Sequence, residues 1–170
     1  PSCGVQTTLQ GGSVPKHLKL ILHIGTEKTG SSSIQAFLLE NRELLIQNGY
    51  YTMKSFRTGH NRALAAYARN PDVEDEFLAQ IGVSDSKSRA AVEQQIEKDV
   101  HAELECLPEC IHTIIVSSEH LHSRIQDADE VEKALSLFTA HCNEQKVLCY
   151  LRPQIEMAVS WYSTCVRNGE

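Results

Sequence analysis

The chain has 170 residues, of which 41% are hydrophobic and 22% are charged. These proportions are close to globular averages and exclude a chain that is disordered throughout, and the length fits one domain, since domains average about 150 residues. The formal net charge of −6, from 16 Lys and Arg against 22 Asp and Glu, excludes the overall positive field of a nonspecific nucleic-acid binder. Any anion site must therefore be built locally.

Residues 1–17 predict a flexible N-terminal arm, because they mix Gly, Ser, Thr and Gln without periodicity. They also lack the basic and apolar regions of a signal peptide, and no segment of the chain reaches the run of about 18 apolar residues that a membrane span needs. The absence of an anchor favours a cytoplasmic protein over the lumenal domain of an anchored one. We expect residues 18–170 to form the folded domain.

The six cysteines are scattered, and several lie in apolar segments, so we expect most of them to be reduced thiols in the core. Cys106, Cys110 and His112 form the one cluster that could bind zinc. A structural zinc site usually has two short ligand pairs, and this cluster does not show them. The sequence therefore predicts no metal.

The first half of the chain predicts a strand, a glycine-rich loop and a helix in that order. Residues 18–24 are rich in Leu and Ile and stop at a glycine, which is typical of a buried strand. After the loop, Ser31 to Ser33 can cap a helix whose apolar residues keep helical spacing as far as Asn48. A short strand at 50–53 and a helix at 61–69 follow.

The second half continues the alternation of helices and strands. A helix is expected at 88–107, where apolar residues recur every four positions, and a strand at 112–116. A helix at 131–138 precedes a strand at 146–151, and a last helix follows Arg152 and Pro153. Strands separated by helices predict an α/β fold with a parallel β-sheet flanked by helices in three layers.

The loop GTEKTGSS at 25–32 lies where ligands bind in such a sheet, beyond the carboxyl end of a strand and at the start of a helix. Its glycines allow close backbone approach, Lys28 adds a positive charge, and Ser31 to Ser33 supply hydroxyl groups. Phosphate or sulfate is the ligand this favours. In the Walker A pattern a lysine would stand where Ser31 does, so a standard magnesium-dependent NTPase is disfavoured.

Two segments resemble parts of one enzyme family. HIGTEKTGSSSIQ (23–35) is similar to the 5′-phosphosulfate-binding loop of the sulfotransferases that use 3′-phosphoadenosine 5′-phosphosulfate (PAPS). YLRPQIEMAVSWY (150–162) resembles their 3′-phosphate-binding segment, in which an Arg at a strand end precedes a Ser on a helix. Arg152 and Ser160 match, eight positions apart (160 minus 152), and the forked guanidinium suits a phosphate.

The resemblance implies a P-loop-like fold and transfer of a sulfuryl group from PAPS to an acceptor hydroxyl, leaving adenosine 3′,5′-bisphosphate, with no metal required. The acceptor would be a carbohydrate or another small hydroxyl compound. Lys28 is the candidate for neutralising charge on the leaving phosphate. The residues expected to hold the 5′ end of the donor are Thr26, Glu27, Lys28, Thr29, Gly30, Ser31, Ser32 and Ser33.

Glu119 is the leading candidate for the catalytic base, because it directly follows a predicted strand and so lies at the same edge of the sheet as the loop. Its placement resembles that of the strand-end histidine or glutamate that serves as base in several branches of the family. His120 and His122 are alternatives. His60 is another, since some branches place the base between the loop helix and the next strand.

The family usually continues beyond the 3′-phosphate segment with further helices and a loop that covers the nucleotide, so we expect the C-terminal part of the family domain to be missing here. Two other functions stay open. One is a P-loop kinase or NTPase-like phosphotransferase, which should bind ATP with magnesium through a strand-end Asp, and no clear candidate for that Asp is present. The other is a truncated nucleotide-binding module without catalysis.

Overall fold

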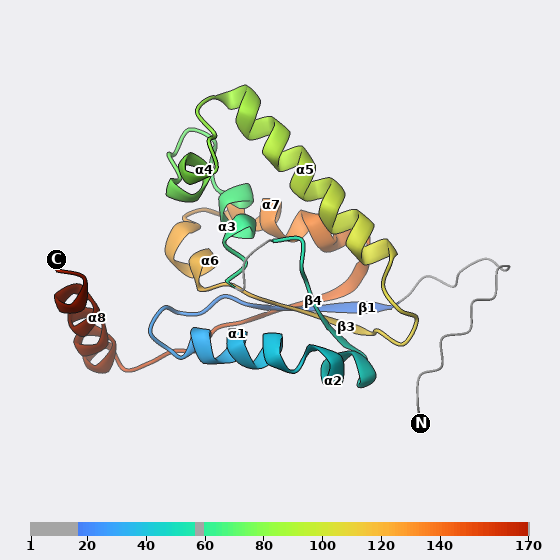
Figure 1. Cartoon of the computed structure of the whole chain (residues 1–170), viewed down its shortest axis with the longest axis horizontal. Coiled ribbons are helices and arrows are strands. Elements are labelled where there is room, and N and C mark those ends of the chain that lie inside the picture. Colours follow the sequence, from blue (N-terminus) through green and yellow to red (C-terminus); the bar gives the residue numbers. More distant parts are fainter. Residues whose placement is uncertain (1–16, 57–59, 170) are drawn as a thin grey trace, which may run out of the picture.

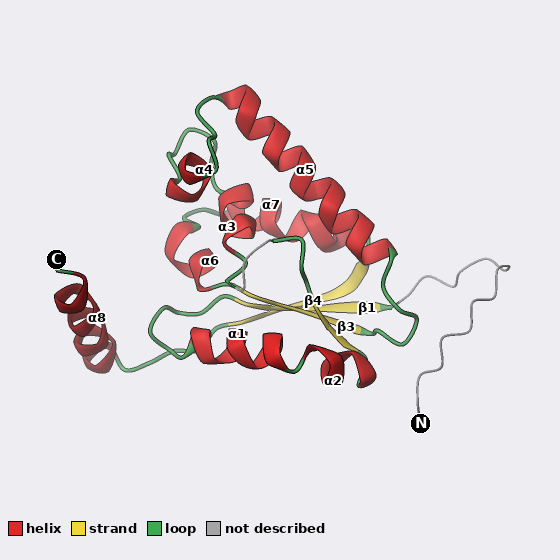
Figure 2. Ribbon diagram, in the orientation of Figure 1, coloured by secondary structure: helices red, strands yellow, loops and turns green. Residues whose placement is uncertain are grey.

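A parallel β-sheet forms the centre of the molecule (Figures 1 and 2). The computed structural model describes residues 17–56 and 60–169, so nearly all of the predicted N-terminal arm lies outside the described residues. Within them, four strands lie in the order β2-β3-β1-β4, and each neighbouring pair is parallel. These strands are β1 (Leu18–His23), β2 (Tyr50–Thr52), β3 (Thr113–Ser117) and β4 (Cys142–Leu148). The predicted α/β fold with a parallel sheet is confirmed.

Helices lie on both faces of the sheet and complete the three layers (Figure 2). One face carries α1 (Ser31–Glu40) and α2 (Arg42–Gln47). The other carries α3 (Arg62–Ala68), α5 (Ser86–Glu105) and α7 (Ala128–Thr139), with the short helices α4 (Glu76–Gln80) and α6 (Glu119–Arg124) beside them. The last helix, α8 (Gln154–Asn168), lies beyond the carboxyl ends of the strands (Figure 1). None of the described helices is both long and apolar enough to cross a membrane.

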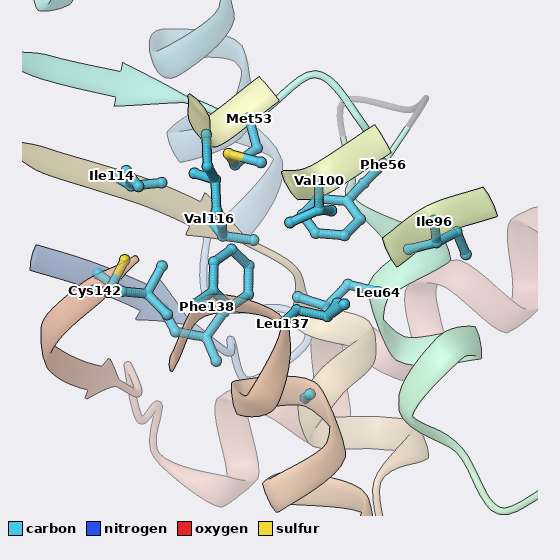
Figure 3. Close-up of a cluster of buried hydrophobic side chains, with 14 of the residues drawn as sticks. Met53, Phe56, Leu64, Ile96, Val100, Ile114, Val116, Leu137, Phe138 and Cys142 are labelled. Atoms are coloured by element: carbon cyan, nitrogen blue, oxygen red, sulfur yellow. The ribbon is translucent and has the colours of Figure 1, made fainter. Parts of the chain in front are cut away.

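The hydrophobic core lies between the sheet and the layer that contains α5 and α7 (Figure 3). Because side chains alternate along a strand, Ile114 and Val116 of β3 both face this layer, and each is fully buried, as is Phe138 of α7. The intervening residues, Ile115 and Ser117, face the opposite side, toward α1. The core therefore fixes β1 and β3, whose carboxyl ends carry the candidate site.

The predicted long helix after the loop is two helices. The chain breaks at Asn41, whose side-chain amide donates to the carbonyl oxygen of Phe37 at 2.9 Å and so ends α1. The predicted serine cap is also wrong: Gly30 is the N-cap residue, it makes no side-chain capping bond, and Ser31 is already the first helical residue. The three serine hydroxyls are therefore not used to start the helix.

The strand predicted at 146–151 is displaced, since β4 begins at Cys142 and ends at Leu148. Arg152 consequently does not end a strand but lies in the connection to α8, whose N-cap residue is Pro153. The helix predicted from residue 88 begins earlier, at Ser86, because Asp85 and Ser88 form a capping box. The sequence patterns missed α4 and α6 because both are short.

The prediction that most cysteines lie in the core is wrong. All five cysteines among the described residues are free, but only Cys142 is buried. Its pKa is raised to about 11 by that burial, which keeps this thiol protonated and unreactive. Cys106 and Cys149 are exposed, and Cys3 lies outside the described residues.

Candidate functional site

The loop between β1 and α1 presents a row of free backbone N–H groups. No backbone carbonyl in the described part of the chain accepts from the N–H groups of residues 28–32, whereas the N–H of Ser33 bonds the carbonyl of Gly30 at 3.0 Å. Lys28 and Gly30 both have positive φ values, 62° and 91°, which turn this backbone away from regular structure. Free N–H groups of this kind, at the start of a helix, favour an anion.

A hollow of about 270 Å³ lies against this loop and contains the leading candidate base. Its walls include Lys28, Ser31 and Ser32 from the loop side and Glu119 and His120 from α6. Glu27 also lines it, so two acidic residues, Glu27 and Glu119, line the same hollow as the lysine. The structure thus brings the predicted phosphosulfate loop and Glu119 together, as the strand-end argument expects.

Thr26, Thr29 and Ser33 do not line this hollow. The Thr26 side chain is buried, its backbone N–H bonds the carbonyl of Tyr150 at 3.0 Å, and its own carbonyl accepts from the Thr29 hydroxyl at 2.5 Å. These two threonines therefore shape the loop and attach it to the segment after β4.

Lys28 extends toward α8. Its ammonium group donates to the hydroxyl of Thr164 at 2.8 Å and lies 5.6 Å from the centre of the Trp161 ring. No carboxylate in the described part of the chain forms an ion pair with it. No described residue therefore neutralises its positive charge, which is available to an anionic ligand.

Glu119 and His60 are connected through Gln35 of α1. The Gln35 amide nitrogen donates to Glu119 Oε2 at 2.5 Å, and its Oε1 lies 2.7 Å from His60 Nδ1. His60 Nδ1 is also 4.0 Å from Glu119 Oε1, and the two side chains are 56% and 13% exposed respectively. Sequence reasoning gave Gln35 no role, although it ends the segment that resembles the phosphosulfate loop. His122, another candidate base, is exposed on α6 and does not line the hollow.

Buried polar groups at the carboxyl ends of β1 and β3 bond one another next to Gln35 and Glu119. Ser117, at the end of β3, bonds His23 Nδ1 through its hydroxyl at 2.8 Å, and its carbonyl accepts from the side-chain amide of Asn61 at 2.9 Å. Burial lowers the pKa of both His23 and His120, and the negative charge of Glu119 offsets only part of that effect. Both histidines are therefore held neutral near pH 7.

We expect the free energy of unfolding to fall below about pH 6.5, the pKa of an unperturbed histidine. Above that pH His23 and His120 are neutral in both states. Below it the unfolded chain binds protons that the folded chain, with its lowered histidine pKa values, does not bind, so acid favours unfolding. Thermal unfolding at pH 7.5 and 5.5 measures the difference. His120→Gln should reduce it, the same change at exposed His122 should not, and equal reductions in both would contradict the assignment.

Arg152 joins the loop to the segment that contains α8. Its Nη1 donates to the carbonyl of Lys28 at 3.1 Å, and its Nε pairs with Glu156 at 3.1 Å. A second hollow, of about 420 Å³, is lined by Arg152 and Ser160, the two residues predicted to hold the 3′-phosphate. Arg167 lines it as well. Sequence reasoning missed Arg167, although residues 156, 160, 163 and 167 have the spacing of a single helix face.

Compared with known proteins, the chain matches no family model, no curated protein and no solved structure at a significant level. Among the described residues, no group of three or more His, Cys, Asp or Glu side chains is placed to hold a metal ion. The function must therefore be argued from the loop, the Gln35 cluster and the α8 segment.

Proposed function

We propose that this chain binds PAPS and transfers its sulfuryl group to an acceptor hydroxyl. The observation that carries the proposal is the pairing of two anion-binding segments, the β1–α1 loop and the Arg152–Ser160 segment, linked by the 3.1 Å bond from Arg152 to the carbonyl of Lys28. PAPS carries anionic groups at its 5′ and 3′ positions and so requires two such sites. A nucleotide with a single phosphate chain would require only the first.

Each part of the site has a role in this reaction. The free N–H groups of residues 28–32 and the ammonium of Lys28 stabilise the negative charge that develops on the leaving phosphate. The oxygen of the acceptor hydroxyl forms a bond to sulfur while the bond from sulfur to the phosphate oxygen breaks. Glu119 accepts the proton that the acceptor hydroxyl loses in this step. The products are a sulfate ester and adenosine 3′,5′-bisphosphate. Gln35 holds the Glu119 carboxylate in place.

A magnesium-dependent NTPase is less well supported by the same residues. Ser31 stands where the Walker A lysine would be, and it lines the hollow without adding charge. Glu119, the acidic residue that follows β3, has its carboxylate bonded to Gln35. The alternative without catalysis shares the nucleotide site and differs only in what Glu119 does.

Calorimetric titration with adenosine 3′,5′-bisphosphate in the presence of EDTA tests the proposal. We expect binding that weakens about tenfold or more in Lys28→Ala and in Arg152→Ala, because each variant removes a charge-assisted interaction with a phosphate. Glu27→Gln should strengthen binding a few-fold, since it removes a like charge facing the same hollow.

Lys98→Ala, which removes an exposed charge on α5, is the matched control and should leave the affinity unchanged. Tighter binding of ATP with magnesium than of adenosine 3′,5′-bisphosphate would contradict the proposal. If only one of the Lys28 and Arg152 variants loses affinity, the nucleotide is held at a single anion site and the two-site part of the proposal fails.

A further inference from the structure

A third hollow, of about 280 Å³, adjoins the candidate base on the side of α1, α2 and β2. Gln35 lines it, together with the buried polar residues Asn61 and Ser117. The Gln35 amide nitrogen bonds Glu119, which lines the hollow beside the loop, so this bonded pair lies between the two hollows. A compound in this third hollow would lie beside Gln35, the residue whose amide bonds the Glu119 carboxylate.

The residues that line this hollow differ in polarity from one end to the other. Gln35, Leu38 and Leu39 line the hollow with the i, i+3, i+4 spacing of one face of α1, and Arg42 lines it from the start of α2. The five residues from Gln35 to the end of α1 at Glu40 advance about 7.5 Å along the helix axis, and Arg42 follows the break at Asn41, at the start of α2. The hollow is therefore polar at the end near Glu119, apolar in its middle and cationic at its far end.

The cationic end has two side chains that form no ion pair with any described residue. Arg42 donates from Nε to the hydroxyl of Thr52 at 3.0 Å, and neither Arg42 nor Lys54 forms an ion pair with a carboxylate in the described part of the chain. The Glu103 carboxylate accepts from the Tyr51 hydroxyl and from the backbone N–H of Lys54, each at 2.8 Å. Among the described residues, no Asp or Glu lines this hollow.

We infer that this hollow binds the acceptor, and that the acceptor is a hydroxyl compound with a carboxylate or sulfate group at the end opposite the hydroxyl that is modified. The anionic group lies between Arg42 and Lys54, where a guanidinium and an ammonium provide charge-assisted hydrogen bonds. Leu38 and Ile115 contact the apolar face of a ring in the middle, and the hydroxyl reaches Glu119 beside Gln35. This inference rests on the proposed sulfuryl transfer and specifies its substrate class.

Cellobiouronic acid and cellobiose provide a matched pair of probes, because they differ only in a carboxylate that replaces a hydroxymethyl group. Each is titrated into the whole chain saturated with adenosine 3′,5′-bisphosphate, and binding is followed by ligand-observed NMR. We expect the acid to bind about tenfold more tightly than the neutral sugar. Arg42→Gln and Lys54→Gln should each reduce this preference, and Lys98→Gln should preserve it.

Lys54→Gln alters an exposed side chain that forms no ion pair with the described residues, so it tests the inference even if Arg42→Gln fails to fold. Equal binding of the two sugars, binding of neither, or a preference that survives both variants overturns the inference while leaving the nucleotide site intact. If the nucleotide itself does not bind, the proposed function fails. The same titration without nucleotide then decides whether the hollow selects acids: a preference removed by Lys54→Gln supports it, and no preference overturns it.

Discussion

Replacing Glu119 by glutamine should lower the rate of sulfuryl transfer by about 100- to 10,000-fold, the range that a general base contributes. Glutamine has nearly the same shape and can still bond Gln35, but it cannot take a proton from the acceptor hydroxyl. Nucleotide affinity should stay the same or increase, because the change removes a negative charge from the hollow beside the loop. Transfer of radiolabelled sulfate from PAPS to an acceptor found by screening hydroxyl compounds measures the rate, and calorimetry measures the affinity.

His60→Gln separates the two candidate bases. The His60 side chain is 56% exposed and does not line the hollow, so its replacement should cost much less than that of Glu119. Glu132→Gln, a change at an exposed position on α7, is the matched control for removal of a carboxylate. A large loss in His60→Gln with little loss in Glu119→Gln would move the role of base to His60. Nucleotide binding without transfer by the wild-type chain would favour the non-catalytic alternative.

Gly49→Ala should lower the free energy of unfolding by about 2–4 kcal/mol, the sum of backbone strain and overpacking. Gly49 has a φ of 82°, and its carbonyl accepts from the backbone N–H groups of His112 and Thr113, where β2 meets β3. A Cβ atom there would overlap the His112 ring and lie 3.0 Å from the carbonyl oxygen of Cys110. Chemical denaturation followed by circular dichroism measures the loss.

Gly82→Ala is the matched control, because Gly82 has nearly the same φ, 83°, but nothing lies within 4 Å of the added Cβ. It should cost only the strain of a left-handed alanine, about 1–2 kcal/mol. The difference between the two variants then isolates the overlap with His112. Equal losses in both would show that the His112 ring moves aside freely.

The sequence allowed prediction of those strands whose burial produces a continuous apolar pattern. β1 and β3 lie in the middle of the sheet, and their runs of Leu, Ile and Val were predicted to within one residue at either end. β4 is an edge strand, and its first half contains Asn143 and Glu144, the latter paired with Lys19 and Lys146 at 3.0 Å each. A strand whose first half is polar has no hydrophobic pattern to detect there, so its start was misplaced by four residues.

The candidate site, too, could be predicted only where its residues form a local pattern in the sequence. The loop could be predicted because its glycines, Lys28 and the serines are contiguous in the chain and follow a clear strand. The link from Gln35 to Glu119 spans 84 positions, and the approach of Arg42 to Thr52 depends on how α2 packs beside β2. Neither leaves a local pattern. Such pairs become visible only when the parallel sheet has placed β2, β3 and β1 side by side.

None of the residues of α8 is buried, and its hydrogen bonds to the loop are made by side chains, such as the bond from Lys28 to Thr164. A ligand that binds both the loop and α8 would therefore hold together two parts that have little apolar contact. Docking of α8 onto the loop and binding of the nucleotide are then thermodynamically coupled. A bound nucleotide favours docking of the helix by the same factor by which a docked helix raises the affinity for the nucleotide. Substitution of α8 residues that do not contact the nucleotide would still weaken nucleotide binding if it weakened docking of the helix. The reason is that the helix loses orientational freedom when the ligand bridges it to the sheet, and this loss lowers the affinity.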